Sequence, residues 1–220
     1  DGSWTAFKDD DRKVKHSCIN SQTKNNKIGT ISEIGGCSRR IVYKALGYKG
    51  DFNFNYKSWE SFYLGSVGQN YIKDILCQKG YKFFCKQKDV SFKGFTGRID
   101  GIILFGEEMN LLECKTLNDS VKYRYFINSS LKSDHRSYYS QIQAYLAATN
   151  MIKCFMVVMG HESDEWHESI IARDNEHLSD LSQKIEKIVE AINRNDLPAR
   201  EPYSIPVNEC DYCPFSTHCK

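Results

Sequence analysis

The stretch GRIDGIILFGEEMNLLECKT, residues 97–116, decides the fold. Two strand-like runs, Gly97–Phe105 and Met109–Thr116, are separated by only a few residues, and this pattern predicts a β-hairpin. A tight turn at Gly106 and Glu107 pairs Phe105 with Glu108, so that paired residue numbers sum to 213. That register sets Asp100 directly opposite Glu113.

The hairpin gathers groups suited to metal chemistry. Glu113 and Lys115 project from one side of their strand, because side chains two residues apart share a face, and Cys114 then points to the opposite, apolar side. Directly opposed Cβ atoms are about 4.5–5.5 Å apart, so Asp100 and Glu113 can hold one divalent cation. Such a group suits phosphodiester hydrolysis, in which Lys115 orients or deprotonates the attacking water. Taken alone, these residues also fit an exposed hairpin with an ordinary Glu–Lys pair.

Periodic apolar residues predict the elements around the hairpin. Helical spacing covers four segments: Ile31 to Gly47, Trp59 to about Gln78, Tyr138 to Thr149, and about Asn175 to Asn195. Two further strand-like runs are Tyr81–Val90 and Met151–Met159. The polar stretch from Leu117 to Ser137 has no clean period, and we interpret it as a loop near the site. This mixture of helical and strand-like segments predicts an α/β fold.

Composition narrows the class of protein. The chain has 220 residues, 40% of them hydrophobic, which suffices for one core and a small appended lobe. With 30 Lys and Arg against 28 Asp and Glu, the net charge of +2 excludes a polybasic protein, so nucleic acid must bind in a local groove. The longest apolar runs fall far short of the roughly 20 residues that a membrane span needs, and no signal-peptide pattern opens the chain. We expect an intracellular protein without a membrane partner.

Nine cysteines favour metal or cluster ligation, because an odd number cannot all pair and the cytosol keeps thiols reduced. Cys210, Cys213 and Cys219 form a Cys-x2-Cys-x5-Cys pattern that needs a fourth ligand from elsewhere. Cys37 lies near a predicted helix start beside two arginines, where a thiolate is favoured. Spacing alone leaves tetrahedral zinc and a four-iron four-sulfur cluster equally open. We interpret the other cysteines as mostly buried small hydrophobes (Cys18, Cys77, Cys85, Cys114 and Cys154) and His218 as a bystander.

The carboxylates and the lysine, with their flanks, resemble the PD-(D/E)XK nuclease superfamily and in particular its RecB-like branch. The resemblance implies that Asp100 and Glu113 are metal ligands, that Lys115 is the catalytic lysine, and that the main-chain carbonyl of Cys114 adds a ligand. It also implies the fold of a PD-(D/E)XK core, which is a mixed central β-sheet flanked by helices.

Two further positions bear on this resemblance. Gln141 and Tyr145 match the Gln-x3-Tyr motif of the RecB-like branch, and four residues apart on a helix they share one face. The family usually carries a metal-binding His on the preceding helix. Here Gln69 stands at that place and offers only a neutral amide oxygen to a metal.

One distal cysteine and three C-terminal cysteines around a RecB-like core resemble the iron-sulfur nucleases, including the CRISPR-associated Cas four family and related phage and helicase-nuclease proteins. This resemblance implies a 4Fe-4S cluster rather than zinc on Cys37, Cys210, Cys213 and Cys219, and Mg or Mn at the carboxylates. It divides the chain into four parts: a polar arm (1–30), the N-terminal part of an iron-sulfur lobe (31–58), the nuclease core (59–197) and the C-terminal part of the lobe (198–220).

The expected function is a Mg- or Mn-dependent deoxyribonuclease, an exonuclease on single-stranded DNA ends with endonuclease activity as an option. The resemblance implies a role in CRISPR adaptation, phage recombination or DNA repair, with an integrase, recombinase or helicase partner, in the cytoplasm of a prokaryotic cell or a phage-infected host. Phosphate contacts and stacking surfaces are expected from six residues: Lys122, Tyr123, Arg124, Tyr125, Lys132 and Arg136.

Two other functions remain open. One is a catalytically weak or inactive DNA-binding or assembly subunit of the same fold, for which Gln69 is the hint. The other is a zinc-stabilised interaction module that binds no nucleic acid.

Overall fold

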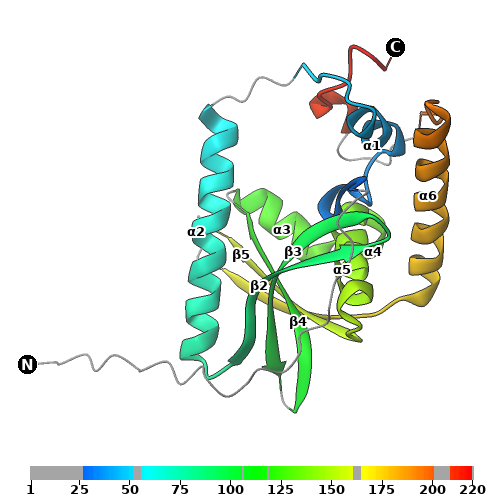
Figure 1. Ribbon diagram of the computed structural model, residues 1–220. Helices are drawn as coiled ribbons and strands as arrows, with labels where there is room; N and C mark the ends of the chain where they lie inside the picture. The colour runs from blue at the N-terminus through cyan, green and yellow to red at the C-terminus, as the bar shows by residue number, and fades with distance from the viewer. Residues whose placement is uncertain are drawn as a thin grey trace, which may run out of the picture.

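A mixed six-stranded sheet forms the centre of the fold (Figure 1). The computed structural model describes residues 27–51, 56–105, 107–117, 119–160, 165–200 and 209–219. Strands β4 and β5 pair in parallel, as do β1 and β3, whereas β2–β3, β3–β4 and β5–β6 are antiparallel. The strands are β1 (Gly29–Thr30), β2 (Lys82–Phe92), β3 (Phe95–Phe105), β4 (Glu108–Leu117), β5 (Lys153–Gly160) and β6 (Trp166–Ala172).

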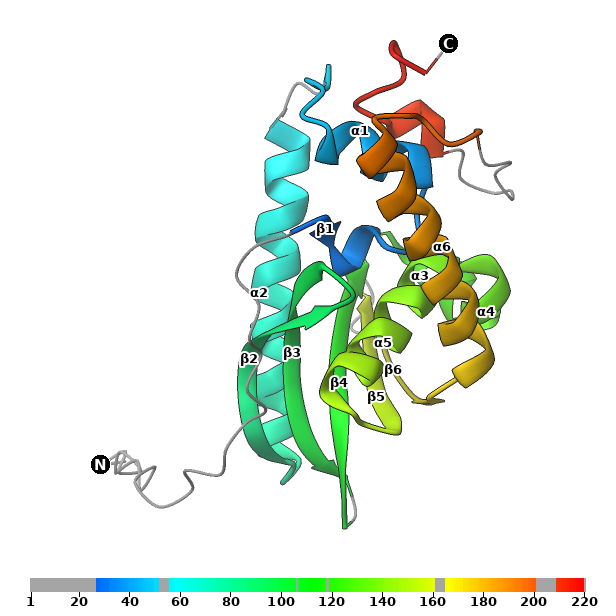
Figure 2. The ribbon, with the colours of Figure 1, turned by 45° about the vertical axis from the view of Figure 1, so that its right-hand side comes forward.

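Helices cover both faces of the sheet, and the long α2 lies on the opposite side from α5 and α6 (Figures 1 and 2). The α-helices are α1 (Ser38–Ala45), α2 (Tyr56–Gln78), α3 (Ser120–Asn128), α4 (Leu131–Asp134), α5 (Arg136–Thr149) and α6 (Asn175–Arg194). Short 3-10 turns span Ile31–Glu33 (η1) and Glu209–Tyr212 (η2). The prediction of a mixed central sheet flanked by helices is confirmed.

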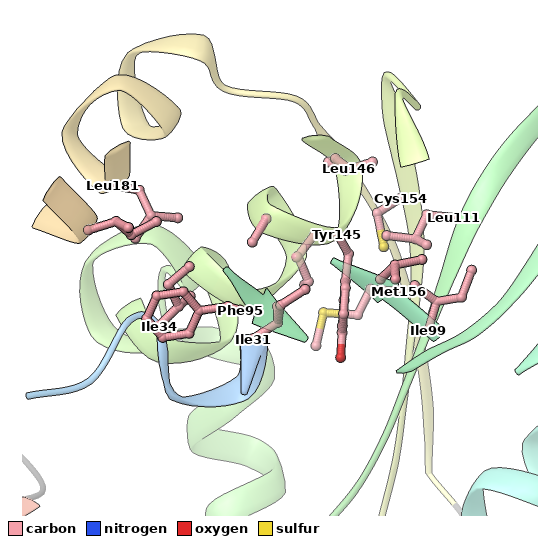
Figure 3. Close-up of a cluster of buried hydrophobic side chains, with 14 of the residues drawn as sticks. Ile31, Ile34, Phe95, Ile99, Leu111, Tyr145, Leu146, Cys154, Met156 and Leu181 are labelled. Carbon is pink, nitrogen blue, oxygen red and sulfur yellow. The ribbon is translucent and has the colours of Figure 1, made fainter. Parts of the chain in front are cut away.

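Strand β5 shows why its sequence is apolar throughout. Met156 and its alternate neighbours pack with Ile142 and Leu146 of α5, in the cluster drawn in Figure 3. The intervening Phe155 and Val157 pack with Ile72 and Leu76 of α2. Because both faces of β5 are covered, it reads as a continuous hydrophobic run.

The predicted hairpin register is confirmed. Phe105 pairs with Glu108, and the ladder continues to Gly101 opposite Leu112. The pairing of β3 with β4 ends there, at the residue next to Asp100. Cys114 points into the apolar cluster under α2, as the alternation predicts.

Other expectations were wrong. The stretch from Leu117 to Ser137 contains α3 and α4, capped by the side chains of Asp119 and Ser130. These helices are short and bury few residues, so the sequence there lacks the long periodic pattern of apolar residues that would predict a helix. The segment from Ile31 is not one helix: η1 and α1 are separated at Gly35, where a Cβ would lie 2.7 Å from the Cα of Ser137.

Strand β6 was not predicted from the sequence, because its residues alternate only between half-buried and exposed. Most of the expected polar arm, with Cys18, lies outside the described residues. Among the helices that are described, none has the length and apolar content needed to cross a membrane.

Candidate active site

Asp100 lies where β3 and β4 stop pairing. Its Oδ2 accepts a hydrogen bond from the Cys114 backbone amide at 2.8 Å, and its Oδ1 accepts one from Nε2 of Gln69 on α2. Burial and the neighbouring Glu113 raise the pKa of Asp100 to about 7. The carboxyl is thus held between the strand and the helix, in a place that penalises its negative charge.

Glu113 is the most enclosed acidic group of the site, with 2% of its side chain exposed. Its Oε1 lies 2.6 Å from Nζ of Lys115 and accepts a hydrogen bond from Nε2 of Gln141 at 3.1 Å. The Lys115 ammonium also lies 4.9 Å from the centre of the Tyr138 ring. Burial lowers the pKa of Lys115, but the bond to Glu113 outweighs it, and the net shift is upward. Lys115 therefore stays charged at neutral pH.

Helix α5 brings its two polar side chains to this place. Gln141 holds Glu113, as described, and the Tyr145 hydroxyl donates to the Arg98 carbonyl at 3.1 Å. Burial and Glu113 raise the pKa of Tyr145 to about 12, so the hydroxyl keeps its proton. Gly97 lets this ring approach β3, since a Cβ there would lie 2.8 Å from ring and hydroxyl atoms of Tyr145. Tyr145 lies among the apolar side chains of the core (Figure 3).

Helix α2 brings Gln69 into contact with Asp100. Gln69 gives its amide nitrogen to Asp100, and its oxygen accepts a hydrogen bond from Nε2 of Gln87 at 3.5 Å. A carboxylate oxygen accepts hydrogen bonds, so the Gln69 oxygen is turned away from it. The structure thus gives Gln69 a contact that positions Asp100, and metal ligation by Gln69 stays a prediction.

Sequence reasoning missed Lys73, one helical turn after Gln69. This lysine is only 6% exposed, and its charge lowers the pKa of Asp100. The spacing of four residues from Gln69 was the available signal, because such residues share one side of a helix.

The oxygen atoms of this site fit a hard cation. Asp100 and Glu113 supply carboxylates, whose oxygen atoms such an ion prefers. Within the described part of the chain, no three His, Cys, Asp or Glu side chains form a group able to hold a metal ion by themselves. Two carboxylates are nevertheless what Mg²⁺ usually takes from a protein, because it keeps several of its waters.

The residues expected to bind DNA divide into two groups. Lys122 and Arg124 of α3 and Arg136 of α5 are exposed, and Tyr125 is 44% exposed. Tyr123 is 2% exposed within the core, which corrects its expected role as a stacking surface. Lys132 is exposed but paired with Asp174 at 2.8 Å.

The cysteines predicted to act together surround one cavity of about 230 Å³, distant in sequence from the carboxylates. Its lining includes Cys37, Cys210, Cys213 and Cys219, with Arg40 and Arg200 beside them. Nη2 of Arg200 lies 3.8 Å from Sγ of Cys210, and burial raises the pKa of the Cys213 thiol.

The C-terminal segment, Glu209–Cys219, reaches this cavity by packing against α1 and the chain that follows it (Figures 1 and 2). Phe215 stacks on Tyr43 with ring centres 5.4 Å apart, and the Tyr43 hydroxyl donates to the His218 carbonyl at 2.7 Å. The His218 ring nitrogen Nε2 donates to the Lys49 carbonyl at 3.0 Å.

The remaining described cysteines only partly follow the expectation of burial. Cys114 and Cys154 are buried, Cys85 is half-buried and Cys77 is exposed.

Several solved structures share this fold. An alkaline exonuclease (LHK-Exo) from Laribacter hongkongensis is 14% identical, with a TM-score of 0.56 over 76% of this chain and 88% of the other. A phage-related exonuclease from Haemophilus somnus 129PT is 13% identical, with a TM-score of 0.58 over 77% and 95%. The protein SSO0001 is 19% identical, with a TM-score of 0.51 over 90% and 88%.

No curated protein matches the sequence. The family described as the PD-(D/E)XK nuclease superfamily matches residues 56–220, well over half of the chain, and includes Asp100, Glu113, Lys115 and the α5 motif. The chain belongs to the PD-(D/E)XK nuclease superfamily.

Proposed function

We propose that the protein is a metal-dependent DNA exonuclease that acts mainly on single-stranded ends. The proposal rests on the placement of Asp100, Glu113 and Lys115 at the open end of the hairpin. There Lys115 forms an ion pair with Glu113, and Gln141 donates a hydrogen bond to Glu113. The similar solved structures include two exonucleases, and LHK-Exo has also been solved in complex with dAMP. We expect an integrase, recombinase or helicase as the partner that supplies or takes the DNA.

Mg²⁺ or Mn²⁺ would be held by Asp100, Glu113 and the Cys114 carbonyl. When bound, such a cation lowers the pKa of a water and neutralises charge on the phosphate. The bond from Gln141 and the ion pair with Lys115 keep the Glu113 carboxylate in one orientation. The amide of Cys114 and Gln69 do the same for Asp100.

Lys115 acts as a fixed cation. Its pKa is raised in the site, so it does not take a proton from water at neutral pH in the metal-free protein. Lys115 could either orient the water and stabilise the phosphate, or deprotonate the water. The raised pKa of Lys115 favours the first role. The Tyr145 hydroxyl donates a hydrogen bond to the carbonyl of Arg98, two residues before Asp100, and so helps to fix this part of β3.

Exposed aromatic side chains support the preference for single strands. On α2, the rings of Trp59 and Tyr63 stack 5.5 Å apart at 6°, although they are 58% and 56% exposed. Tyr63 precedes Gln69 by about 9 Å along the helix axis at the usual rise per residue. Unpaired bases can stack on such rings, and Lys122 and Arg124 offer phosphate contacts.

A 4Fe-4S cluster is our proposal for the cysteine-lined cavity. Zinc also takes four thiolates, each about 2.3 Å from the metal. Four thiolates spread around a cavity of about 230 Å³ suit a larger cluster better. Held there, the cluster would join Cys37 at the start of α1 to the C-terminal segment.

The orientation of Gln69 keeps one alternative in view, a DNA-binding subunit of this fold that has lost efficient cleavage. The test is a time course with end-labelled linear single strands, circular single strands and duplex DNA, in Mg²⁺ and in Mn²⁺. The exonuclease proposal expects mononucleotides or short products from the linear single strand, slower loss of the duplex and an intact circle. Binding of all three without product in either metal would instead support the alternative.

A further inference from the structure

Lys73 is a buried charge that the mechanism above does not use. The residue is 6% exposed. It lies on α2 between Ile72 and Leu76, which both belong to the buried apolar cluster under this helix. Lysine is almost never buried to this degree unless it is paired. Among the described residues the Lys73 ammonium forms no hydrogen bond or ion pair, and its Nζ is not one of the fully enclosed nitrogen atoms that lack a partner there, so the side chain is buried along its length while its tip meets solvent.

Lys73 lies on the side of α2 that faces Asp100. Gln69, one turn earlier on the same side of α2, donates a hydrogen bond to Asp100. The Lys73 ammonium acts electrostatically on Asp100 and on Cys114, the two residues at the opening of the hairpin. It thus approaches the carboxylates from α2, while Lys115 contacts Glu113 from β4.

The charges of the site then limit how many metal ions it can hold. With both carboxyls ionised, as they are above the pKa of Asp100 of about 7, two carboxylates and two ammonium groups sum to zero before any metal enters. One divalent cation leaves a net charge of +2 beside a phosphate that carries negative charge. A second cation would raise it to +4 in a largely buried place, where like charges repel strongly.

We propose that Lys73 takes the place of a second metal ion: the site binds one divalent cation, and the Lys73 ammonium neutralises the scissile phosphate. This inference rests on the proposed nuclease function. It makes Lys73 a catalytic residue whose removal has opposite effects on two measurements. Cleavage should weaken because a positive charge at the phosphate is lost, whereas metal binding should strengthen because a repelling charge is lost.

The test compares wild type, Lys73→Met and Lys73→Arg. Metal-free protein is titrated with Mn²⁺ and free Mn²⁺ is read by electron paramagnetic resonance, without DNA. We expect one Mn²⁺ per wild-type chain and about fivefold or tighter binding in Lys73→Met. Cleavage of labelled single strands at saturating Mn²⁺ should fall about 100-fold in Lys73→Met and less in Lys73→Arg, which keeps the charge.

The matched control is Lys79→Met, near the end of the same helix, where the lysine is exposed and paired with Glu168 at 3.2 Å. It should change neither measurement. Two Mn²⁺ ions per wild-type chain, or unchanged affinity and rate in folded Lys73→Met, would overturn the proposal. If Lys73→Met does not fold, Lys73→Gln replaces it under the same criteria. A wild type that cleaves no DNA refutes the nuclease function instead, and the Mn²⁺ titration still reports the charge effect separately.

Discussion

Asp100 and Glu113 are each stabilised by particular neighbours rather than by solvent. Glu113 has a lysine and an amide within hydrogen-bond distance, while Asp100 relies on a backbone amide and on Gln69. This difference agrees with the raised pKa of Asp100, because its partners compensate less of the cost of burial. Asp100 is the acidic group whose protonation should respond to pH near neutrality.

Asp100 should destabilise the metal-free fold as the pH rises. Its pKa is about 7 in the folded protein against an ordinary 3.8, so between these values the folded state keeps a proton that the unfolded chain releases. Stability is therefore lost as the pH rises through this window. We expect Asp100→Asn to raise the Tm more at about pH 8 than at about pH 4, measured by circular dichroism in a chelator. An equal change in Tm at both pH values would contradict this.

Gly97→Ala should disturb the site through Tyr145. The new Cβ would lie 2.8 Å from the tyrosine, so the ring must shift and release the Arg98 carbonyl. We expect a loss of about 1–3 kcal/mol in the free energy of unfolding, measured with urea, and slower cleavage. The control is Gly65→Ala on α2, where the nearest atom is 4.0 Å away and alanine should stabilise the helix. Equal effects of the two substitutions would refute the role given to Gly97.

Helix α2 contributes both Gln69 and the exposed aromatic pair of Trp59 and Tyr63. At about 100° per residue and by the shorter way round the helix, Trp59 lies about 80°, Tyr63 about 120° and Tyr71 about 160° from Gln69. Both Trp59 and Tyr71 are more than half exposed, at 58% and 53%. Of the three exposed rings, Tyr71 therefore lies farthest around the helix from Gln69.

The double variant Trp59→Ala with Tyr63→Ala should bind single-stranded DNA about tenfold or more weakly, because each stacked base contributes about 1–3 kcal/mol. Fluorescence anisotropy in Ca²⁺ measures this binding without requiring cleavage. Tyr71→Ala is the matched control and should leave affinity unchanged. A loss of the same size for Tyr71→Ala, or none for the double variant, would remove this face of α2 from the DNA path.

The sequence predicts features that neighbouring residues determine better than features that depend on tertiary packing. The hairpin register follows from the tight turn and the strand pattern, and the structure confirms it through Gly101 opposite Leu112. The α3 helix was missed, because its caps at Asp119 are local but its burial of Tyr123 depends on the tertiary fold. Lys73 was not singled out from the sequence, because only the packing of α2 on the sheet buries its side chain.

At the scale of the whole molecule, the C-terminal segment is joined to residues near the start of the described chain. Stacking of Phe215 on Tyr43 and the backbone bond from Asp51 to the Pro214 carbonyl at 2.7 Å connect regions more than 160 residues apart. A cluster on the four cysteines would add a further link across this junction. The stacking and the hydrogen bond exist only in the folded chain, and a cluster held there would add its binding free energy to that of folding.

Anaerobically purified protein should therefore be brown and contain iron and acid-labile sulfide. Cys213→Ala should lose both and unfold at a lower temperature, because cluster binding contributes to the free energy of folding. Cys77→Ala is the control, since Cys77 is exposed on α2 and away from the cavity lining. Elemental analysis decides the matter, and stoichiometric zinc without iron would contradict the cluster.

The central claim is that Glu113, held by Lys115 and Gln141, takes part in phosphodiester hydrolysis. Its most direct test is the single-turnover cleavage rate of end-labelled single-stranded DNA in Mn²⁺ for wild type and Glu113→Gln, purified in parallel. Glu190→Gln, which alters a surface pair with Arg194 on α6, serves as the control. The account predicts cleavage by wild type and by the control, and a loss of about two orders of magnitude or more in folded Glu113→Gln. Equal rates in Glu113→Gln and wild type would contradict it.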